Sequence, residues 1–273
     1  MNPLNFQAAI EVVRAVGDQL RIRYADLEPI VDNAAMMAAF RELDGAASKQ
    51  IRQALAASHP DIAWLDGELE GAGAWRGAEA GRFWACDAID GAVQFLRRIP
   101  HWCVSLTLVE AGAAAATVVH DAMHGEVFHA VAGAGAWCNG ERLRVNGRQS
   151  HRGALLATSQ PPFSNDDDFV VNGSTSSLEA ALREAGAVRN LGPTSLQLAY
   201  VASGRLDAFW EYGEDTFNCL GGALLVSEAG GLATDAAGRP YGPASDSIVA
   251  APPAVHRSLS ALFARSSGAR SSR

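Results

Sequence analysis

Two aspartates and a glycine lie close together about a third of the way along the chain. Asp87 follows the apolar run 83–86, Asp90 comes three residues later, and Gly91 follows directly. Two carboxylates this close repel each other unless one takes up a proton or a cation lies between them. A hard divalent ion such as Mg²⁺ is the natural partner of a few carboxylates and a substrate phosphate. The spacing therefore allows a cation site, although the motif by itself fits an ordinary surface turn better.

The elements around this motif follow from hydrophobic spacing. The run 83–86 predicts a buried strand, and residues 92–97 predict the first turns of a helix. The N–H groups of Gly91 and Ala92 would then lie at a helix N-terminus, which favours an anion. Cation and anion sites are therefore expected side by side. The alternative is a surface turn with two solvated aspartates, and the rest of the chain shifts the balance away from it.

Hydrophobic spacing divides the chain into parts of different character. Residues 1–150 predict helices followed by a largely antiparallel sheet, and residues 151–264 predict alternating strands and helices. Residues 265–273 predict a disordered tail. The predicted helices are 4–24, 32–40, 44–57, 178–185, 194–202, 217–229 and 253–263. The main predicted strands are 62–65, 83–86, 102–109, 116–120, 126–131, 136–137, 154–158, 188–191, 206–210 and 247–251.

The composition bounds the class of protein. The chain has 273 residues, 48% hydrophobic and 19% charged, which fits a globular protein with a sizeable core. A net charge of −8 argues against nonspecific nucleic-acid binding, but a cation would still allow a phosphorylated substrate. The four scattered cysteines, the apparent lack of a signal peptide and the absence of a long apolar run lead us to expect a cytoplasmic protein without membrane contact.

Several motifs resemble the inositol monophosphatase family, in the order that the family has them. Residues 87–95, D-A-I-D-G-A-V-Q-F, are similar to the family signature D-P-I/L-D-G-T-x-N-F. Residues 222–231, G-A-L-L-V-S-E-A-G-G, resemble the second signature, A-G-x-x-I/L-V-x-E-A-G-G. Weaker matches lie at 125–128, 135–140, 191–195 and 204–209. The resemblance covers most of the chain, and together the motifs indicate its fold more strongly than any one of them alone.

The resemblance implies a fold and an activity. The fold would be the layered α-β-α-β-α sandwich of the sugar-phosphatase superfamily, in the mixed α/β (α+β) class and usually a homodimer. The activity would be hydrolysis of a small phosphate monoester, such as an inositol monophosphate or a sugar phosphate, by a metal-activated water. One to three Mg²⁺ ions would be bound. The partner would be this small substrate, with no nucleic acid and no membrane.

The resemblance also implies roles for individual residues. Glu68, Asp87 and the main-chain carbonyl of Ile89 would hold a first metal ion, and Asp87 and Asp90 would share a second. Asp44 would lie near the attacking water, so that Asp44, Glu68 and Asp90 are the expected catalytic residues. These assignments apply family positions to matching residues of this chain.

The expected substrate contacts are also carried over from the family. The amides of Gly91 and Ala92 would hold the phosphate. Thr194 and Glu211 would contact the substrate, with Glu211 near its hydroxyl groups.

The first metal ligand lies in the acidic turn 66–70, D-G-E-L-E. Glu68 is the preferred ligand, but Asp66 or Glu70 takes its place if the alignment of this turn shifts. Taken alone, the turn also fits an ordinary hydrated loop.

Two departures from the family pattern bear on the chemistry. Ala92 replaces a threonine whose hydroxyl would help to deprotonate the attacking water, and such help is typically worth about 10²–10⁴ in rate. Asn218 replaces an aspartate on the second metal; its amide oxygen still coordinates but brings no charge, so weaker binding of that ion is expected. Asp215 carries a spare carboxylate three residues earlier, but its place at a helix start is expected to point it elsewhere.

Three functions therefore compete. The first is a Mg²⁺-dependent phosphatase, slow because its second metal site is degenerate. The second is a non-catalytic relative that binds a phosphorylated ligand or a protein partner, which Ala92 and Asn218 favour. The third is a nucleotidase for 3′-phosphoadenosine phosphates, for which the chain is short. Serine and zinc hydrolases lack support, since the sequence has neither G-x-S-x-G nor a helical H-x-x-x-H.

Overall fold

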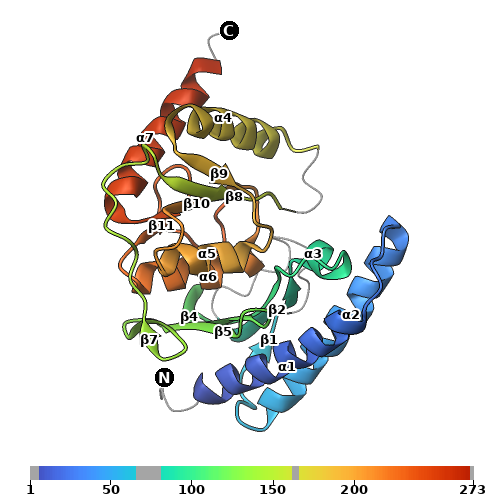
Figure 1. Ribbon diagram of the computed structural model, residues 1–273. Coiled ribbons are helices and arrows are strands. Elements are labelled where there is room, and N and C mark those ends of the chain that lie inside the picture. Colours follow the sequence, from blue (N-terminus) through green and yellow to red (C-terminus); the bar gives the residue numbers. More distant parts are fainter. Residues whose placement is uncertain (1–5, 66–80, 162–165, 271–273) are drawn as a thin grey trace.

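The computed structural model describes residues 6–65, 81–161 and 166–270, which form two β-sheets with helices around and between them (Figure 1). The helices of this part of the chain are α1 (Phe6–Asp26), α2 (Asn33–Ala56), α3 (Ala92–Leu96), α4 (Asp168–Glu184), α5 (Thr194–Ala202), α6 (Thr216–Glu228) and α7 (Pro253–Arg270). Its strands are β1 (Ala63–Trp64), β2 (Arg82–Asp90), β3 (Cys103–Glu110), β4 (Ala113–Asp121), β5 (Glu126–Val131), β6 (Gly135–Cys138), β7 (Glu141–Arg142), β8 (Leu155–Thr158), β9 (Ala187–Arg189), β10 (Ala208–Tyr212), β11 (Leu232–Thr234) and β12 (Ser247–Ala251).

Helices and sheets alternate in five layers (Figure 1). α1 and α2 cover one face of the seven-stranded sheet, and α5 and α6 lie between the two sheets. α4 and α7 cover the outer face of the five-stranded sheet. Each interface holds its own cluster of buried apolar side chains, which removes apolar surface from water on both faces of each sheet. The predicted α-β-α-β-α sandwich is confirmed.

The two sheets differ in topology. The first runs in chain order from β1 to β7 and is antiparallel except for the parallel pair β1–β2. The second has the order β11-β12-β10-β8-β9 and mixes parallel with antiparallel pairs. In β3, Val104 and Leu106 enter the core under α1 and α2, while Cys103 enters the core around α5 and α6. The alternation of successive side chains thus buries this strand on both faces.

Two glycines allow α6 to approach its neighbours closely. A Cβ atom on Gly221 would lie 2.3 Å from Oγ1 of Thr107 in β3, and one on Gly222 would lie 2.4 Å from Cδ1 of Leu198 in α5. Both distances are shorter than van der Waals contact, so a larger side chain would push α6 away from the sheet or from α5. These contacts fix the position of the N-terminal end of α6, where functional side chains lie.

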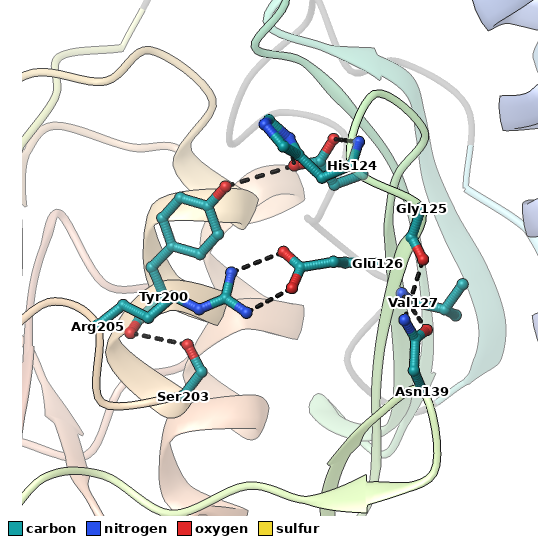
Figure 2. A network of polar contacts seen from close by, with 9 residues as sticks. His124, Gly125, Glu126, Val127, Asn139, Tyr200, Ser203 and Arg205 are labelled. Atoms are coloured by element: carbon teal, nitrogen blue, oxygen red, sulfur yellow. Dashed lines mark hydrogen bonds and ion pairs between the residues drawn. The ribbon is translucent and has the colours of Figure 1, made fainter.

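A polar network joins the second part of the chain to the first sheet (Figure 2). Arg205 donates from both terminal guanidinium nitrogens to the carboxylate of Glu126 in β5 and lies 5.2 Å from the ring centre of Tyr200. The hydroxyl of Tyr200 donates to Asp121, which also accepts from the main-chain N–H of His124. Residues 1–150 and 151–264 therefore share polar contacts as well as a core, and their division into domains stays a prediction.

One continuous helix, α2, replaces the two predicted helices 32–40 and 44–57. Asp32 caps it by accepting from the N–H of Ala35 at 2.8 Å. The alanines, methionines and leucine of its middle are good helix formers and carry it past the predicted break. Ile51 and Leu55 are buried in the second half, whereas no residue of the first half is fully buried. The second half therefore anchors the helix.

Further elements differ from expectation. α4 starts well before the predicted 178, because Asp167 caps it by accepting from the N–H groups of Phe169 and Val170 at 2.9 and 3.3 Å. The short strands β7 and β11 were not predicted. α7 continues to Arg270, into the segment 265–273 for which we expected disorder.

Candidate active site

A cavity of about 680 Å³ opens where β2 ends and α3, α5 and α6 begin. The first half of α2 forms another of its walls. This volume is within the range of small-molecule sites. The described residues that line the cavity are Asn33, Met36, Met37, Phe40, Asp87, Ile89, Asp90, Gly91, Ala92, Val93, Gln94, Leu96, Ser159, Gln160, Pro161, Asn190, Gly192, Thr194, Asp215 and Asn218.

A β-bulge brings both aspartates of the first motif to this cavity. In a regular strand, residues three apart point to opposite faces. Asp87 pairs with Ser105 of β3 and Asp90 with Cys103, so two residues of β2 stand opposite a single residue of β3. The extra residue shifts the alternation of side chains by one, so that Asp87 and Asp90 point to the same face and both line the cavity.

Asp90 is held in a buried, polar setting. It is 5% exposed, and its Oδ2 accepts from the N–H of Ser195 at 2.8 Å, in the first turn of α5. The thiol of Cys103 lies 3.6 Å from the same oxygen. Burial raises the pKa of Asp90 to about 7, and the nearby charge of Asp215 adds to this increase. A bound cation would favour the ionised form.

Gly91 makes the tight connection from β2 to α3. Its φ of 93° is in the left-handed region, and a Cβ atom there would lie 2.8 Å from Cγ of Pro193, just before α5. Glycine is therefore needed both for the backbone conformation and for the close approach of α3 to α5. Gly91 and Ala92 both line the cavity, and their role in holding a phosphate stays a prediction.

A second acidic group lies at the end of β10 and the start of α6. Glu211 is 1% exposed, and its Oε2 accepts from the hydroxyl of Thr194 at 3.1 Å. Ligand atoms of Glu211, Asp215 and Cys219 lie within 4.8 Å of one another. Burial raises the pKa of Glu211 well above its ordinary value, and the Asp215 charge raises it further.

The expectation that Asp215 points elsewhere is wrong. Asp215 is the N-cap residue of α6 and lines the cavity. Its Oδ1 accepts from the side-chain Nδ2 of Asn218 at 2.9 Å. Residues three apart at a helix start face each other across the first turn, so the side chain is directed along the helix to residue 218 and into the cavity.

Asp44 reaches the β2 bulge from α2. Burial raises the pKa of Asp44 to about 6, and the neighbouring N–H groups of Ala88 and Ile89 and the hydroxyl of Ser48 oppose this rise. Asp44 is not among the described cavity-lining residues, whereas Ile89 is. The structure thus places Asp44 beside the bulge, and its role near an attacking water stays a prediction.

The charge of the cavity is unbalanced. Asp87, Asp90 and Asp215 line it, and its described lining includes no lysine, arginine or histidine. Carboxyl groups collected without a basic partner hold protons or a cation. Glu68, the expected first ligand, and its alternatives Asp66 and Glu70 lie outside the described residues.

Three buried oxygen atoms near these acids have no hydrogen-bond donor within the described part of the chain: Oδ1 of Asp44, Oε1 of Glu211 and Oδ1 of Asn218. Of these residues Asn218 lines the cavity, and the carboxyl group of Glu211 meets that of Asp215, a contact that a shared proton or a cation satisfies. Buried polar atoms are nearly always paired, so the amide oxygen of Asn218 at the cavity indicates a missing ligand. Carboxylate, amide and carbonyl oxygens are the donors that Mg²⁺ takes in proteins, and the residues present fit such an ion.

The sequence reasoning missed the apolar wall of the cavity. Met36, Met37 and Phe40 of α2 and Val93 of α3 line it, and Val93 is 59% exposed. The apolar spacing of residues 36, 37 and 40 predicted a helix, but it does not say whether the apolar face covers a core or a cavity. In the structure, Met36 and Phe40 do both, since they line the cavity and pack against the core cluster under α1 and α2.

The five alternating layers and the acid-lined cavity between them are those of a phosphatase-type fold of the layered sandwich class. A sequence model of the inositol monophosphatase family matches residues 5–270. The chain belongs to the inositol monophosphatase family.

Similar proteins carry two kinds of name. The Nus factor SuhB of Pseudomonas aeruginosa (strain PAO1) is 41% identical over 200 residues, 72% of each chain. The inositol-1-monophosphatase of Rhizobium meliloti (strain 1021) is 34% identical over 199 residues, again 72% of each chain. The solved inositol monophosphatase from Anabaena (Nostoc) sp. PCC 7120 superposes with a TM-score of 0.80 at 24% identity, covering 95% of this chain and 94% of that one.

Within the described residues, none of the helices combines the length and apolar character that a membrane span requires.

Proposed function

We propose that this chain hydrolyses a small phosphate monoester, of the inositol phosphate or sugar phosphate class, with Mg²⁺ as cofactor. The observation that supports this most is a cavity with three aspartates and no basic residue in its described lining. These acids need a cation to stay ionised together, and an anionic phosphate needs the same cation to approach them. In this proposal the metal ligands are Glu68, Asp87, Ile89, Asp90 and Asn218, for one to three ions.

Bound Mg²⁺ would lower the pKa of a coordinated water and offset the charge of the phosphoryl oxygens. Asp44, whose pKa is about 6, is largely ionised at neutral pH and is therefore available to accept a proton from that water. Glu68 and Asp90 complete the catalytic set. Ala92 has no hydroxyl to assist this transfer, so turnover is expected to be slow.

The substrate would be held from two sides. The amides of Gly91 and Ala92 would orient the phosphate at the start of α3. Thr194 and Glu211, which share a hydrogen bond of 3.1 Å, would contact the alcohol part of the substrate. The rigid setting of this pair suits it to fixing orientation.

The test is an assay of phosphate release. Inositol 1-phosphate, sugar phosphates and 3′-phosphoadenosine phosphates are supplied with and without Mg²⁺. We expect release that depends on Mg²⁺, disappears in Asp87→Asn and persists in Glu214→Gln, which removes an exposed carboxylate close to the cavity. No release from any of these substrates at millimolar concentration would refute the proposal.

A second candidate function is non-catalytic binding of a phosphorylated ligand or a protein partner. Ala92 supports it, and so does the name Nus factor given to the Pseudomonas aeruginosa relative. The double substitution Ala92→Thr/Asn218→Asp separates the two candidates. Strong activity created from an inactive native protein would favour the second, whereas a native protein that already turns over and changes little would exclude it.

We also propose that the chain is a cytoplasmic homodimer that binds neither nucleic acid nor membranes. The family supports the dimer, and the net charge of −8 opposes nonspecific nucleic-acid binding. Light scattering after gel filtration would show a mass near twice that of the chain, and a monomer at micromolar concentration would contradict the dimer.

A further inference from the structure

Residue 218 lacks a charge, but its side chain is held in a defined orientation. The Nδ2 of Asn218 donates to Oδ1 of Asp215 at 2.9 Å. This bond holds the amide next to the carboxylate, and Oδ1 of Asn218 is buried with no hydrogen-bond partner among the residues described. The amide oxygen of Asn218 is therefore available as a ligand, and the carboxylate of Asp215 lies beside the amide.

A second buried acid lies next to this pair. Glu211 is 1% exposed and its Oε2 accepts from Thr194. Its carboxyl group meets that of Asp215, and two carboxyl groups in contact share a proton or hold a cation. Ligand atoms of Glu211 and Asp215 come within 4.8 Å of each other. Two acids and an amide oxygen therefore converge at the start of α6 without a basic group in the described cavity lining.

We propose that Asp215 supplies the negative charge that residue 218 lacks, so that the carboxylate of Asp215 and Oδ1 of Asn218 together hold the second divalent cation, beside Asp90. This inference rests on the proposed metal-dependent function. The sequence led us to expect a weak second metal site. In this proposal the site keeps its negative charge, which Asp215 carries three residues before Asn218 at the start of α6. Hard oxygen donors make the ion Mg²⁺ or Mn²⁺.

The thiol of Cys219 is an alternative metal ligand at the start of α6. Its Sγ belongs to the group of ligand atoms that lie within 4.8 Å of one another, and a thiolate ligand would select a softer ion such as Zn²⁺. Cys219 is 2% exposed and borders two carboxyl groups, which disfavour a second negative charge. The oxygen ligands therefore define the site.

The experiment counts bound ions. Native protein is titrated with Mn²⁺, free Mn²⁺ is read from its electron paramagnetic resonance signal, and the affinities are confirmed by calorimetry. We expect Asp215→Asn to weaken the second ion by about tenfold or more, since one unit charge next to a dication is lost. Glu214→Gln is the matched control: it removes the neighbouring, exposed carboxylate and leaves both affinities unchanged.

Three more variants extend the test, and two of them, Asn218→Asp and Cys219→Ser, remain available if Asp215→Asn folds poorly. Asn218→Asp alone is expected to change the second affinity by less than about threefold, because the charge is already present; a tenfold gain would refute the inference. Asp215→Asn/Asn218→Asp is expected to restore the native affinity. Cys219→Ser is expected to keep both Mn²⁺ ions, and loss of one would assign the site to the thiol.

The outcomes separate this inference from the function on which it rests. If native protein binds no Mn²⁺, the metal-dependent function and the role of Asp215 both fail. If native protein binds two ions and Asp215→Asn binds them with unchanged affinities, only the role of Asp215 fails.

Discussion

Two sides of one cavity differ in origin and in chemistry. The acidic side consists of Asp87 and Asp90 from β2 and Asp215 from the start of α6. The apolar side consists of Met36, Met37 and Phe40 from the first half of α2, with Val93 from α3. The side chains of Asp87 and Asp90 are buried, whereas those of the apolar side are only partly buried or exposed.

The two sides are expected to control different properties, catalysis on the one hand and substrate preference on the other. Acids on a rigid support can be held in the geometry that a metal ion and a phosphate require. An apolar surface that is partly exposed has no such constraint and contributes mainly through the area that a ligand covers. We therefore expect the acidic side to set whether the reaction occurs and the apolar side to set which alcohol is preferred.

The largest expected effect is that of Asp90→Asn. It removes a buried carboxylate from the acidic side, and we expect kcat/KM for phosphate release to fall by about 10³ or more, because metal binding and charge stabilisation are lost together. Circular dichroism should show native folding. Activity within tenfold of native would mean that the acidic side does not carry the chemistry.

The second largest effect is a gain. Ala92→Thr adds a hydroxyl at the start of α3, next to the acidic side, and we expect kcat to rise by about tenfold to 10²-fold with little change in KM. Val93→Thr is the matched control, because it adds a hydroxyl one residue further along the same helix. An equal gain from both variants would show that the position of the hydroxyl is not what matters.

A smaller effect is expected from the apolar side. Met37→Gln should lower kcat/KM for an aryl or alkyl phosphate relative to a polyol phosphate by about tenfold, since pocket contacts of this size are worth about 1–3 kcal/mol. Ala38→Gln changes the next, exposed residue of α2 outside the described lining and should leave the ratio unchanged. A ratio that Met37→Gln does not alter would remove the apolar side from substrate selection.

The smallest effect concerns stability without metal. The pKa values of Asp90 and Asp44, about 7 and about 6, exceed the 3.8 of an ordinary aspartate. The folded state thus binds more protons than the unfolded state between these values, and stability falls as pH rises from about 4 to about 7. Thermal unfolding should show a Tm lower by a few degrees at about pH 7.5 than at about pH 5.

Added Mg²⁺ should reverse this trend, because the ion needs the ionised acids. The Tm should rise more at about pH 7.5 than at about pH 5, and the Asp90→Asn variant should show a flatter pH dependence without metal. A Tm of the metal-free native protein that increases with pH over this range would contradict the raised pKa values.

Much of the fold could be predicted from local spacing. The alternation in residues 126–131 predicted β5, and the strand 247–251 was predicted with the bounds that β12 has. The continuity of α2 and the early start of α4 could not. The first depends on which half of α2 is anchored, and the second on Asp167, which fits a polar loop as well as a helix cap. Local patterns do not contain those choices.

The candidate site was predictable to a similar extent. The motif from Asp87 to Gly91 marked the cavity from residue types alone, and the family signatures indicated the fold. Asp215 was assigned the wrong direction, because a helix start allows several side-chain orientations and only the hydrogen bond with Asn218 selects one. The apolar side was missed because its residues fit a core equally well.

By itself, the sequence determined the kinds of groups present: two aspartates and a glycine at a strand end, an asparagine where the family has an aspartate, and a family signature at each end of the site. Only the tertiary structure decided how they meet. The bulge in β2 brings Asp87 and Asp90 to one cavity, and the close packing of α6 places Asp215 beside them. The reason is physical: residue types follow from the chain, but direction follows from packing between segments far apart in it.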